Sequence, residues 1–139
     1  MRTLFATALL IGASLACAQE RTPSPAGAEV YIITPKNGAH VSSPVVVRFG
    51  LKGMGIAPAG VKFDNTGHHH LLIDTDPPAD LSAPLPATDK IVHFGKGQTE
   101  TSLTLTPGKH TLQLLLADQN HIPHSPPLLS QKITITVVK

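Results

Sequence analysis

Histidine supplies the most concentrated chemistry in this chain of 139 residues. Six of its eight histidines fall into a triplet, a pair and a single residue between them: His68, His69 and His70, then His121 and His124, with His110 in between. Imidazole nitrogen is a common protein ligand for copper, zinc and nickel ions. The grouping therefore predicts a metal site.

The triplet begins a predicted strand, in which successive side chains point to opposite faces. His68 and His70 then share one face, about 7 Å apart, and His69 shares the other face with Leu71 and Ile73. If Leu71 and Ile73 face the core, His69 is structural and the other two are available to a metal ion. If the strand is turned over, the assignments exchange.

The histidine pair lies in the loop sequence NHIPHSPP, where a proline between His121 and His124 restricts the backbone. This restriction reduces the conformational entropy that is lost when the two rings close around an ion. A four-ligand site would combine His68 or His70 with His121 and His124. Asp118 or a water molecule would complete it.

The ligand types favour copper(II) over zinc(II). Copper(II) lies at the top of the affinity order for nitrogen ligands and takes tetragonal sites, whereas zinc prefers tetrahedral ones. Cys17 is the only cysteine, and Met54 is the only methionine beyond Met1. This composition argues against a dedicated copper(I) site made of thiolates or thioethers.

The remaining histidines have competing interpretations. His110 is a further candidate ligand, but its position after the Pro107-Gly108 turn also suits a structural hydrogen bond. His93, in the sequence IVHFG, fits either a hydrogen-bonding residue near a turn or a ligand. His40 is expected on a solvated loop.

The first residues predict export. Arg2 precedes an apolar stretch and then small residues, which is typical of a signal peptide over residues 1–18 that is cleaved after Ala18. The alternative is a lipoprotein anchored through Cys17. We expect a periplasmic or secreted protein with a flexible leader over residues 19–28 and a single domain over residues 29–139.

Charge excludes some classes of partner. Loss of Arg2 with the signal peptide leaves ten basic and nine acidic side chains, so the mature chain has a net charge near +1. This balance predicts neither a nucleic-acid-binding surface nor a polybasic membrane patch. The early apolar stretch is shorter than the roughly 20 residues of a transmembrane helix, and no later segment supplies one.

The elements that must position the histidines read as strands. Thirteen prolines, eleven glycines and β-branched runs predict an all-β fold, an immunoglobulin-like antiparallel β-sandwich of seven or eight strands. A segment with four prolines, residues 75–90, is expected to be a long surface loop. The expected strands are residues 29–34, 45–51, 61–63, 68–74, 91–94, 101–105, 110–117 and 131–138.

Two resemblances follow from longer motifs. The stretches HHHLLID, HFGKGQTE and LTPGKHTLQLLLADQNHIPHSPPLLSQKITITV resemble the bacterial exported family called domain of unknown function 4399, a name that conveys no activity. More loosely, PKNGAHVSSPVVV and the later order of Pro107, Gly108, Asp118 and His121 resemble periplasmic copper carriers of the CopC type. That resemblance implies copper bound by an amino-terminal histidine. Here the expected start is Gln19, so this ligand is missing.

No catalytic motif is present: the sequence has no nucleophile elbow, phosphate-binding glycine loop or HExxH helix. We therefore expect a non-enzymatic protein that binds a divalent metal as a carrier, buffer or sensor, with copper preferred because of the ligand types described above. One alternative is an accessory domain of the cell envelope that contacts another protein or a glycan and whose histidines are structural. Another is a scaffold whose partner affinity depends on pH.

Overall fold

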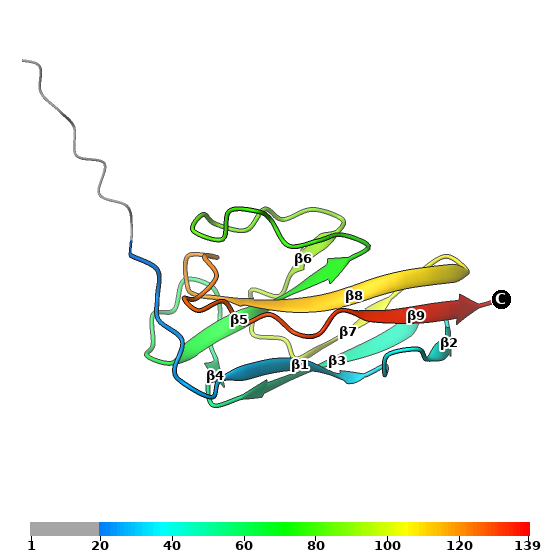
Figure 1. Cartoon of the computed structure of the whole chain (residues 1–139), viewed down its shortest axis with the longest axis horizontal. Coiled ribbons are helices and arrows are strands. Elements are labelled where there is room, and N and C mark those ends of the chain that lie inside the picture. Colours follow the sequence, from blue (N-terminus) through cyan, green and yellow to red (C-terminus); the bar gives the residue numbers. More distant parts are fainter. Residues whose placement is uncertain (1–19) are drawn as a thin grey trace, which may run out of the picture.

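Nine strands and no helix occur in the part of the chain that the computed structural model describes, residues 20–139. They form two sheets in a sandwich-like, all-β arrangement, which confirms the predicted fold class (Figure 1). The predicted signal peptide and Cys17 lie outside the described residues. The strands are β1 Glu29–Thr34, β2 His40–Ser42, β3 Val45–Lys52, β4 Gly55–Ile56, β5 Thr66–Ile73, β6 Ile91–His93, β7 Glu100–Leu103, β8 Gly108–Ala117 and β9 Ile133–Val138.

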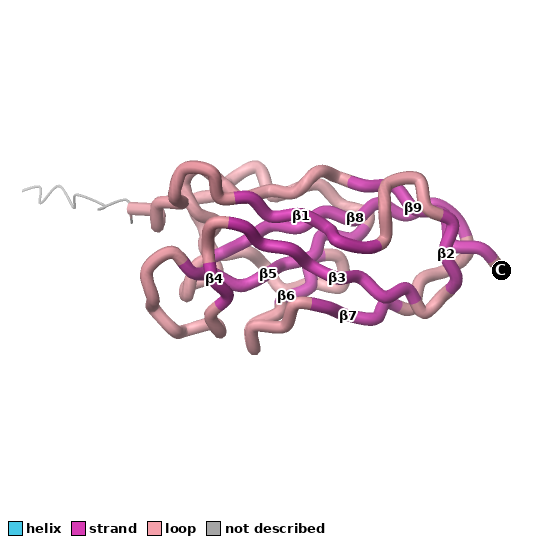
Figure 2. The backbone as a smooth tube through the Cα atoms, turned by 90° about the horizontal axis from the view of Figure 1, so that it is seen from below, coloured by secondary structure: helices cyan, strands magenta, loops and turns pink. Residues whose placement is uncertain are grey.

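The smaller sheet has the strand order β1-β3-β7 and is antiparallel throughout. Its β3 strand alternates as a half-buried strand should, with Val45, Val47 and Phe49 buried and Val46 and Arg48 exposed. Figure 2 shows this sheet in front of the larger one. One face of β3 is therefore committed to the space between the sheets.

The larger sheet has the order β2-β9-β8-β5-β4, and β6 pairs with another part of β5. The pairs between β9, β8, β5 and β6 are antiparallel, but β2 runs parallel to β9 and β4 runs parallel to β5. The predicted antiparallel pairing therefore holds for the main strands, and two short edge strands add parallel pairs that the sequence did not predict. Both parallel strands are only two or three residues long and show no periodicity in the sequence.

One predicted strand is absent. Residues 61–63 form an irregular loop, in which Val61 is 48% exposed and Phe63 is 72% exposed. The β-branched and aromatic residue types suggested a strand, but no neighbouring strand pairs with this segment. Loop packing has overridden local propensity here.

The main core lies between the two sheets. Leu71 of β5, Leu112 and Leu114 of β8, and Ile135 of β9 are fully buried in it against Val47 of β3. Leu71 and Ile73 belong to this core, which fixes the orientation of β5. The face of β5 that carries them is the inner face of the sandwich.

A second, smaller core covers the outer face of the larger sheet. Leu85, from the proline-rich loop of residues 75–90, is buried against Leu72, Ile91 and Leu115, and Leu81 packs beside them. The loop lies over β5 and β6, where it appears in green in Figure 1. As a result β5 is buried on both faces for most of its length.

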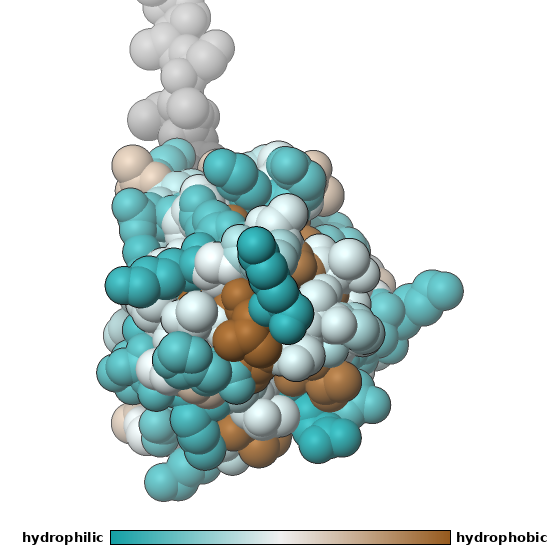
Figure 3. All heavy atoms as spheres, turned by 90° about the vertical axis from the view of Figure 1, so that its right-hand side faces the viewer, coloured by the Kyte–Doolittle hydropathy of each residue, from teal (hydrophilic) through white to brown (hydrophobic). Residues whose placement is uncertain are grey.

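The two ends of the sandwich differ. Residues 20–24 and the loop after β8 gather at the end on the left of Figure 1. Figure 3 views the opposite end, where hydrophilic side chains surround a small group of apolar ones. Residues 20–139 contain no helix long and apolar enough to cross a membrane.

Candidate metal centre

Four histidines converge on the outer face of the larger sheet. Each offers one ring nitrogen, and these four nitrogens all lie within 4.8 Å of one another. The four side chains come from three separate segments of the chain. They are His68 and His70 of β5, His93 of β6 and His121 of the loop after β8.

Strand geometry places three of the four rings. Leu71 and Ile73 face the core, so the alternation of β5 turns His68 and His70 to the outer face. β6 runs antiparallel to β5 with His93 directly opposite His70. Directly opposed residues have side chains on the same face, and the rings of His70 and His93 are accordingly 5.1 Å apart between centroids.

The fourth ring comes from the loop of residues 118–126, which we call the His121 loop. Nδ1 of His121 lies 3.2 Å from Nε2 of His68, and Nε2 of His93 lies 3.1 Å from that same Nε2 atom. The rings of His93 and His121 are 4.6 Å apart between centroids. His68 is therefore the centre of the cluster, and the other rings are arranged around it.

This arrangement does not suit a closed hydrogen-bond network. A neutral imidazole nitrogen carries either one proton or one lone pair, so Nε2 of His68 cannot form a full hydrogen bond with both neighbours at once. In addition, Nδ1 of His68 and Nδ1 of His70 are buried without any hydrogen-bond partner. The four rings therefore do not satisfy one another's hydrogen-bonding atoms, and each buried polar atom left unpaired costs about 1–3 kcal/mol.

The environment keeps the buried rings neutral, which is the form that binds metal. Burial, followed by the neighbouring His93 and His121, lowers the pKa of His68 from 6.5 to about 4. Burial and then the neighbouring histidines lower the pKa of His70 to about 3. The pKa of His93 is also lowered, mainly by burial. These lone pairs are thus available at neutral pH.

The donor set and spacing fit a transition metal. Two nitrogens bound to one ion at about 2.0–2.1 Å and a tetrahedral angle are about 3.3–3.4 Å apart, close to the separations around His68. Four nitrogens without an oxygen donor suit copper, zinc or nickel and do not suit magnesium or calcium, which prefer oxygen. Small ring movements would bring the four nitrogens to either a tetrahedral or a tetragonal arrangement.

A comparison with protein families matches residues 47–138 to the model described as Domain of unknown function (DUF4399). The chain belongs to this family. The matched residues include all four histidines of the cluster. No curated protein and no solved structure matches the chain, and the likeness to CopC-type copper carriers is not shown by these comparisons.

Two histidines predicted as ligands of the DUF4399 domain lie away from the cluster. His69 points into the main core, where its ring centroid is 5.1 Å from that of Phe49 and both of its nitrogens are buried without partners. The sequence left open which face of β5 points inward, and the burial of Leu71 and Ile73 in the main core makes His69 the structural member of the triplet. His124 is fully buried, and its Nε2 atom lies 3.2 Å from the carbonyl oxygen of Thr66. Neither ring is among the four that converge.

His110 and Asp118 also have other partners. Nδ1 of His110 lies 2.7 Å from a carboxylate oxygen of Asp74, and its Nε2 lies 2.8 Å from the carbonyl oxygen of Thr106. Both carboxylate oxygens of Asp118 accept hydrogen bonds within 3.1 Å, from Thr22 and from main-chain amides of its own loop. The prediction that these two residues ligate the ion is therefore corrected to structural roles.

His93 is the ligand for which the sequence left both interpretations open. Its neighbours Ile91 and Val92 predicted a strand, but the sequence did not state which strand it would pair with. The signal that would have identified it is pairing with β5, because any antiparallel register that opposes His93 to His68 or His70 places all three rings on one face. Gly95 also matters, since a Cβ atom there would lie 2.3 Å from the His93 ring.

Proposed function

We propose that this DUF4399 domain binds one divalent transition-metal ion, copper(II) in preference to zinc(II), through His68, His70, His93 and His121. The observation that carries the proposal is the convergence of four ring nitrogens from three chain segments within 4.8 Å. Copper(II) is preferred because the donors are all nitrogens and copper leads the affinity order for such ligands.

The proposed role is that of a carrier, buffer or sensor in the periplasm, and not of an enzyme. Catalytic zinc sites keep one coordination position open for water or substrate, whereas four imidazoles would fill a tetrahedral zinc site or the four equatorial positions of a tetragonal copper(II) site. His93 and His121 are only half-buried, so an ion can enter and leave on their side while His68 and His70 form the floor. Exchange with a partner would take place from that side.

Calorimetry and chelator competition with copper(II) and zinc(II) at neutral pH test the proposal. We expect one copper(II) ion per chain with a dissociation constant far below micromolar, and a loss of at least about 100-fold on H93A or H121A. These two ligands are chosen because they are half-buried and their removal disturbs the core least. H40Q is the matched control, since His40 is an exposed histidine of β2 outside the cluster.

Binding that is only micromolar, or that is unchanged in H93A and H121A, would overturn the proposal and favour an accessory role for the domain. Elemental analysis of protein purified from its native host then identifies the physiological ion. Copper at one equivalent supports the preference stated above. Zinc at one equivalent keeps the site and overturns the preference.

A further inference from the structure

The predicted leader is hydrogen-bonded to the His121 loop, which carries one of the four clustered histidines. Residues 21–24, which we call the strap, run beside residues 123–126 of the His121 loop. The amide of Ser125 donates to the carbonyl of Thr22 at 2.9 Å, and the amide of Ser24 donates to the carbonyl of Ser125 at 3.0 Å. The guanidinium of Arg21 donates to the carbonyl of Pro123 at 3.0 Å and also to that of His124. Although the sequence predicted a flexible leader, these residues make specific contacts.

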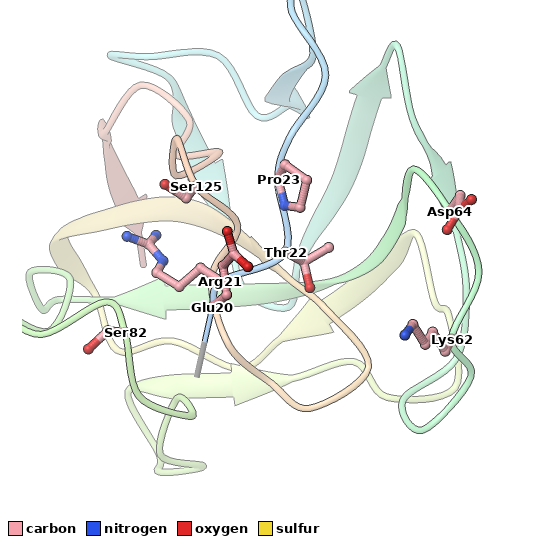
Figure 4. A pocket seen from close by; sticks show the side chains of 8 residues that line it. All are labelled: Glu20, Arg21, Thr22, Pro23, Lys62, Asp64, Ser82 and Ser125. Atoms are coloured by element: carbon pink, nitrogen blue, oxygen red, sulfur yellow. The ribbon is translucent and has the colours of Figure 1, made fainter. Parts of the chain in front are cut away.

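Figure 4 shows an open groove that is lined by Arg21, Thr22 and Ser125 together with Lys62 and Asp64. None of the four clustered histidines lines this groove. The strap therefore contributes none of the four converging side chains. Any effect of the strap on an ion must pass through the His121 loop.

Asp118 joins the strap to that loop. One of its oxygens accepts hydrogen bonds from the amides of Asn120 at 2.9 Å and Ile122 at 3.1 Å, on either side of His121. Its other oxygen accepts a hydrogen bond from the Thr22 hydroxyl at 2.6 Å. The Asp118 side chain is buried, so these bonds form away from competing water. The Thr22 hydroxyl thus orients the Asp118 carboxylate, and that carboxylate holds the turn around His121.

The backbone of His121 needs such support. Its φ angle of 64° lies in the left-handed region, which residues other than glycine adopt only when their surroundings hold them there. The amide of His121 donates to the Asp118 carbonyl at 2.9 Å, and the His121 carbonyl accepts from the amide of Leu85 at 2.8 Å. The Asp118 turn and the Leu85 amide therefore hold the backbone from which the His121 ring reaches His68.

We propose that Thr22 and Asp118 are positioning residues of the metal centre, so that the strap is a working part of the site. This inference rests on the proposed function. Outer-shell groups that orient a ligand typically change metal affinity by about 10- to 100-fold. We expect T22V, which keeps the shape of the side chain and removes its hydroxyl, to weaken copper(II) binding about tenfold. D118A, which removes the whole carboxylate, is expected to weaken it more.

The test measures copper(II) affinity and the electron paramagnetic resonance spectrum of the full domain with residues 19–139. T22S keeps the hydroxyl and should restore wild-type affinity. S24A removes another strap hydroxyl, one that donates to the Pro126 carbonyl at 2.7 Å and not to Asp118, and should leave affinity within about twofold. The spectrum should report four nitrogen ligands in the wild type and a three-nitrogen fraction in T22V, as in H121A.

A double-mutant cycle identifies the route of the effect. If Thr22 acts through His121, T22V/H121A binds copper(II) as weakly as H121A alone. Equal affinity of T22V and wild type, or an unchanged tenfold loss in the H121A background, would overturn the inference while the proposed function stands. Micromolar or weaker binding by the wild type would overturn both. Amide exchange at His121 without metal should also rise in T22V, and unchanged exchange would contradict the positioning role.

Discussion

The clustered histidines and His110, another histidine of the larger sheet, have opposite environments. In the cluster, His68 and His70 have buried Nδ1 atoms without partners, and their pKa values are lowered to about 4 and about 3. His110 lies in β8, beside the other end of β5. Both of its ring nitrogens have hydrogen-bond partners, and the hydrogen bond with Asp74 raises the pKa of His110. The same side chain is therefore kept neutral in one place and is favoured as a cation in the other.

The difference lies in what the neighbouring segments supply. Asp74 directly follows β5, and one of its oxygens also accepts the amide of Thr111 at 2.8 Å, so a carboxylate is fixed in place for His110. Around His68 the nearest rings are other imidazoles and no carboxylate is among the four converging side chains, although the Asp118 carboxylate raises the pKa of His68 to a smaller extent than burial lowers it. Unpaired neutral nitrogens can bind an ion, whereas a doubly paired imidazolium cannot. Pairing explains why His110 is not available to an ion, but His69 also has unpaired nitrogens, so the convergence of four ring nitrogens is what distinguishes the candidate ligands.

The largest expected effect is the pH dependence of the metal-free domain. His68, His69 and His70 have folded-state pKa values of about 3–4, below the unfolded value of 6.5. Between pH 6.5 and about 4, these three histidines are protonated in the unfolded chain and neutral in the folded chain. Stability is then lost as pH falls towards 4, by about 1.4 kcal/mol per pH unit for each fully responding group.

Urea unfolding at pH 7.5, 6.5 and 5.5 measures this loss. His110 acts in the opposite direction, because its raised pKa gives stability that is present below pH 6.5 and lost as pH rises through the folded value. A free energy of unfolding that stays constant from pH 7.5 to 5.5 would contradict the neutral, desolvated state that we assign to the cluster.

Gly95 offers a way to break the cluster from outside. A Cβ atom at this position would lie 2.3 Å from the His93 ring, and the ring is the part that can move. We expect G95A to fold, to displace the His93 ring and to weaken copper(II) binding by about 10-fold or more. G55A is the matched control, because its new methyl group would meet only Thr66, at 3.5 Å. Wild-type affinity in G95A would show that His93 is not a ligand.

Asp74 offers a way to break the other group. D74N removes the carboxylate that faces His110, and we expect a loss of about 1 kcal/mol in the free energy of unfolding at pH 6, since Asp74 is partly exposed and its charge is screened. Copper(II) affinity should stay the same, because the pair is separate from the cluster. Thermal unfolding and calorimetry on one preparation measure both quantities. A fall in the copper(II) affinity of D74N would show that the pair of His110 and Asp74 is coupled to the cluster.

The smallest effect concerns His69, the third environment. Its ring is buried beside Phe49, and neither nitrogen has a partner. We expect H69L to stabilise the domain slightly, by about 0.5 kcal/mol at neutral pH, because an unpaired polar group is replaced by an apolar one of similar size. Copper(II) affinity should be unchanged. A large loss of affinity would mean that the inner face of β5 takes part in binding.

The sequence predicted which segments form strands better than it predicted which strands pair with each other. The β-branched runs of β1 and β3, the apolar run of β8 and the triplet of β5 were sufficient to locate these strands and to place His69 on the opposite face from His68 and His70. The short strands β2 and β4 were missed because two or three residues carry no periodic signal. Their parallel pairing also depends on chain crossings that local patterns do not encode.

For the site, His68, His70 and His121 were predicted and His93 was left undecided. His93 joins the cluster only through its register with β5, which is a property of the assembled sheet. Asp118 was assigned to the ion because a carboxylate near histidines suits a metal. Its actual partner, Thr22, lies 96 residues earlier in the chain, a distance over which sequence spacing gives no guidance.

If the four histidines bind an ion as proposed, their separation along the chain determines when that ion can be acquired. His68 is 25 residues from His93 and 53 residues from His121. A newly made, extended polypeptide holds only the His68 and His70 pair near each other, so it retains ions weakly. A chain that crosses a membrane unfolded would arrive without its metal and take it from the compartment where it folds. The ion found in the mature protein would then reflect supply at the destination and not supply at the ribosome.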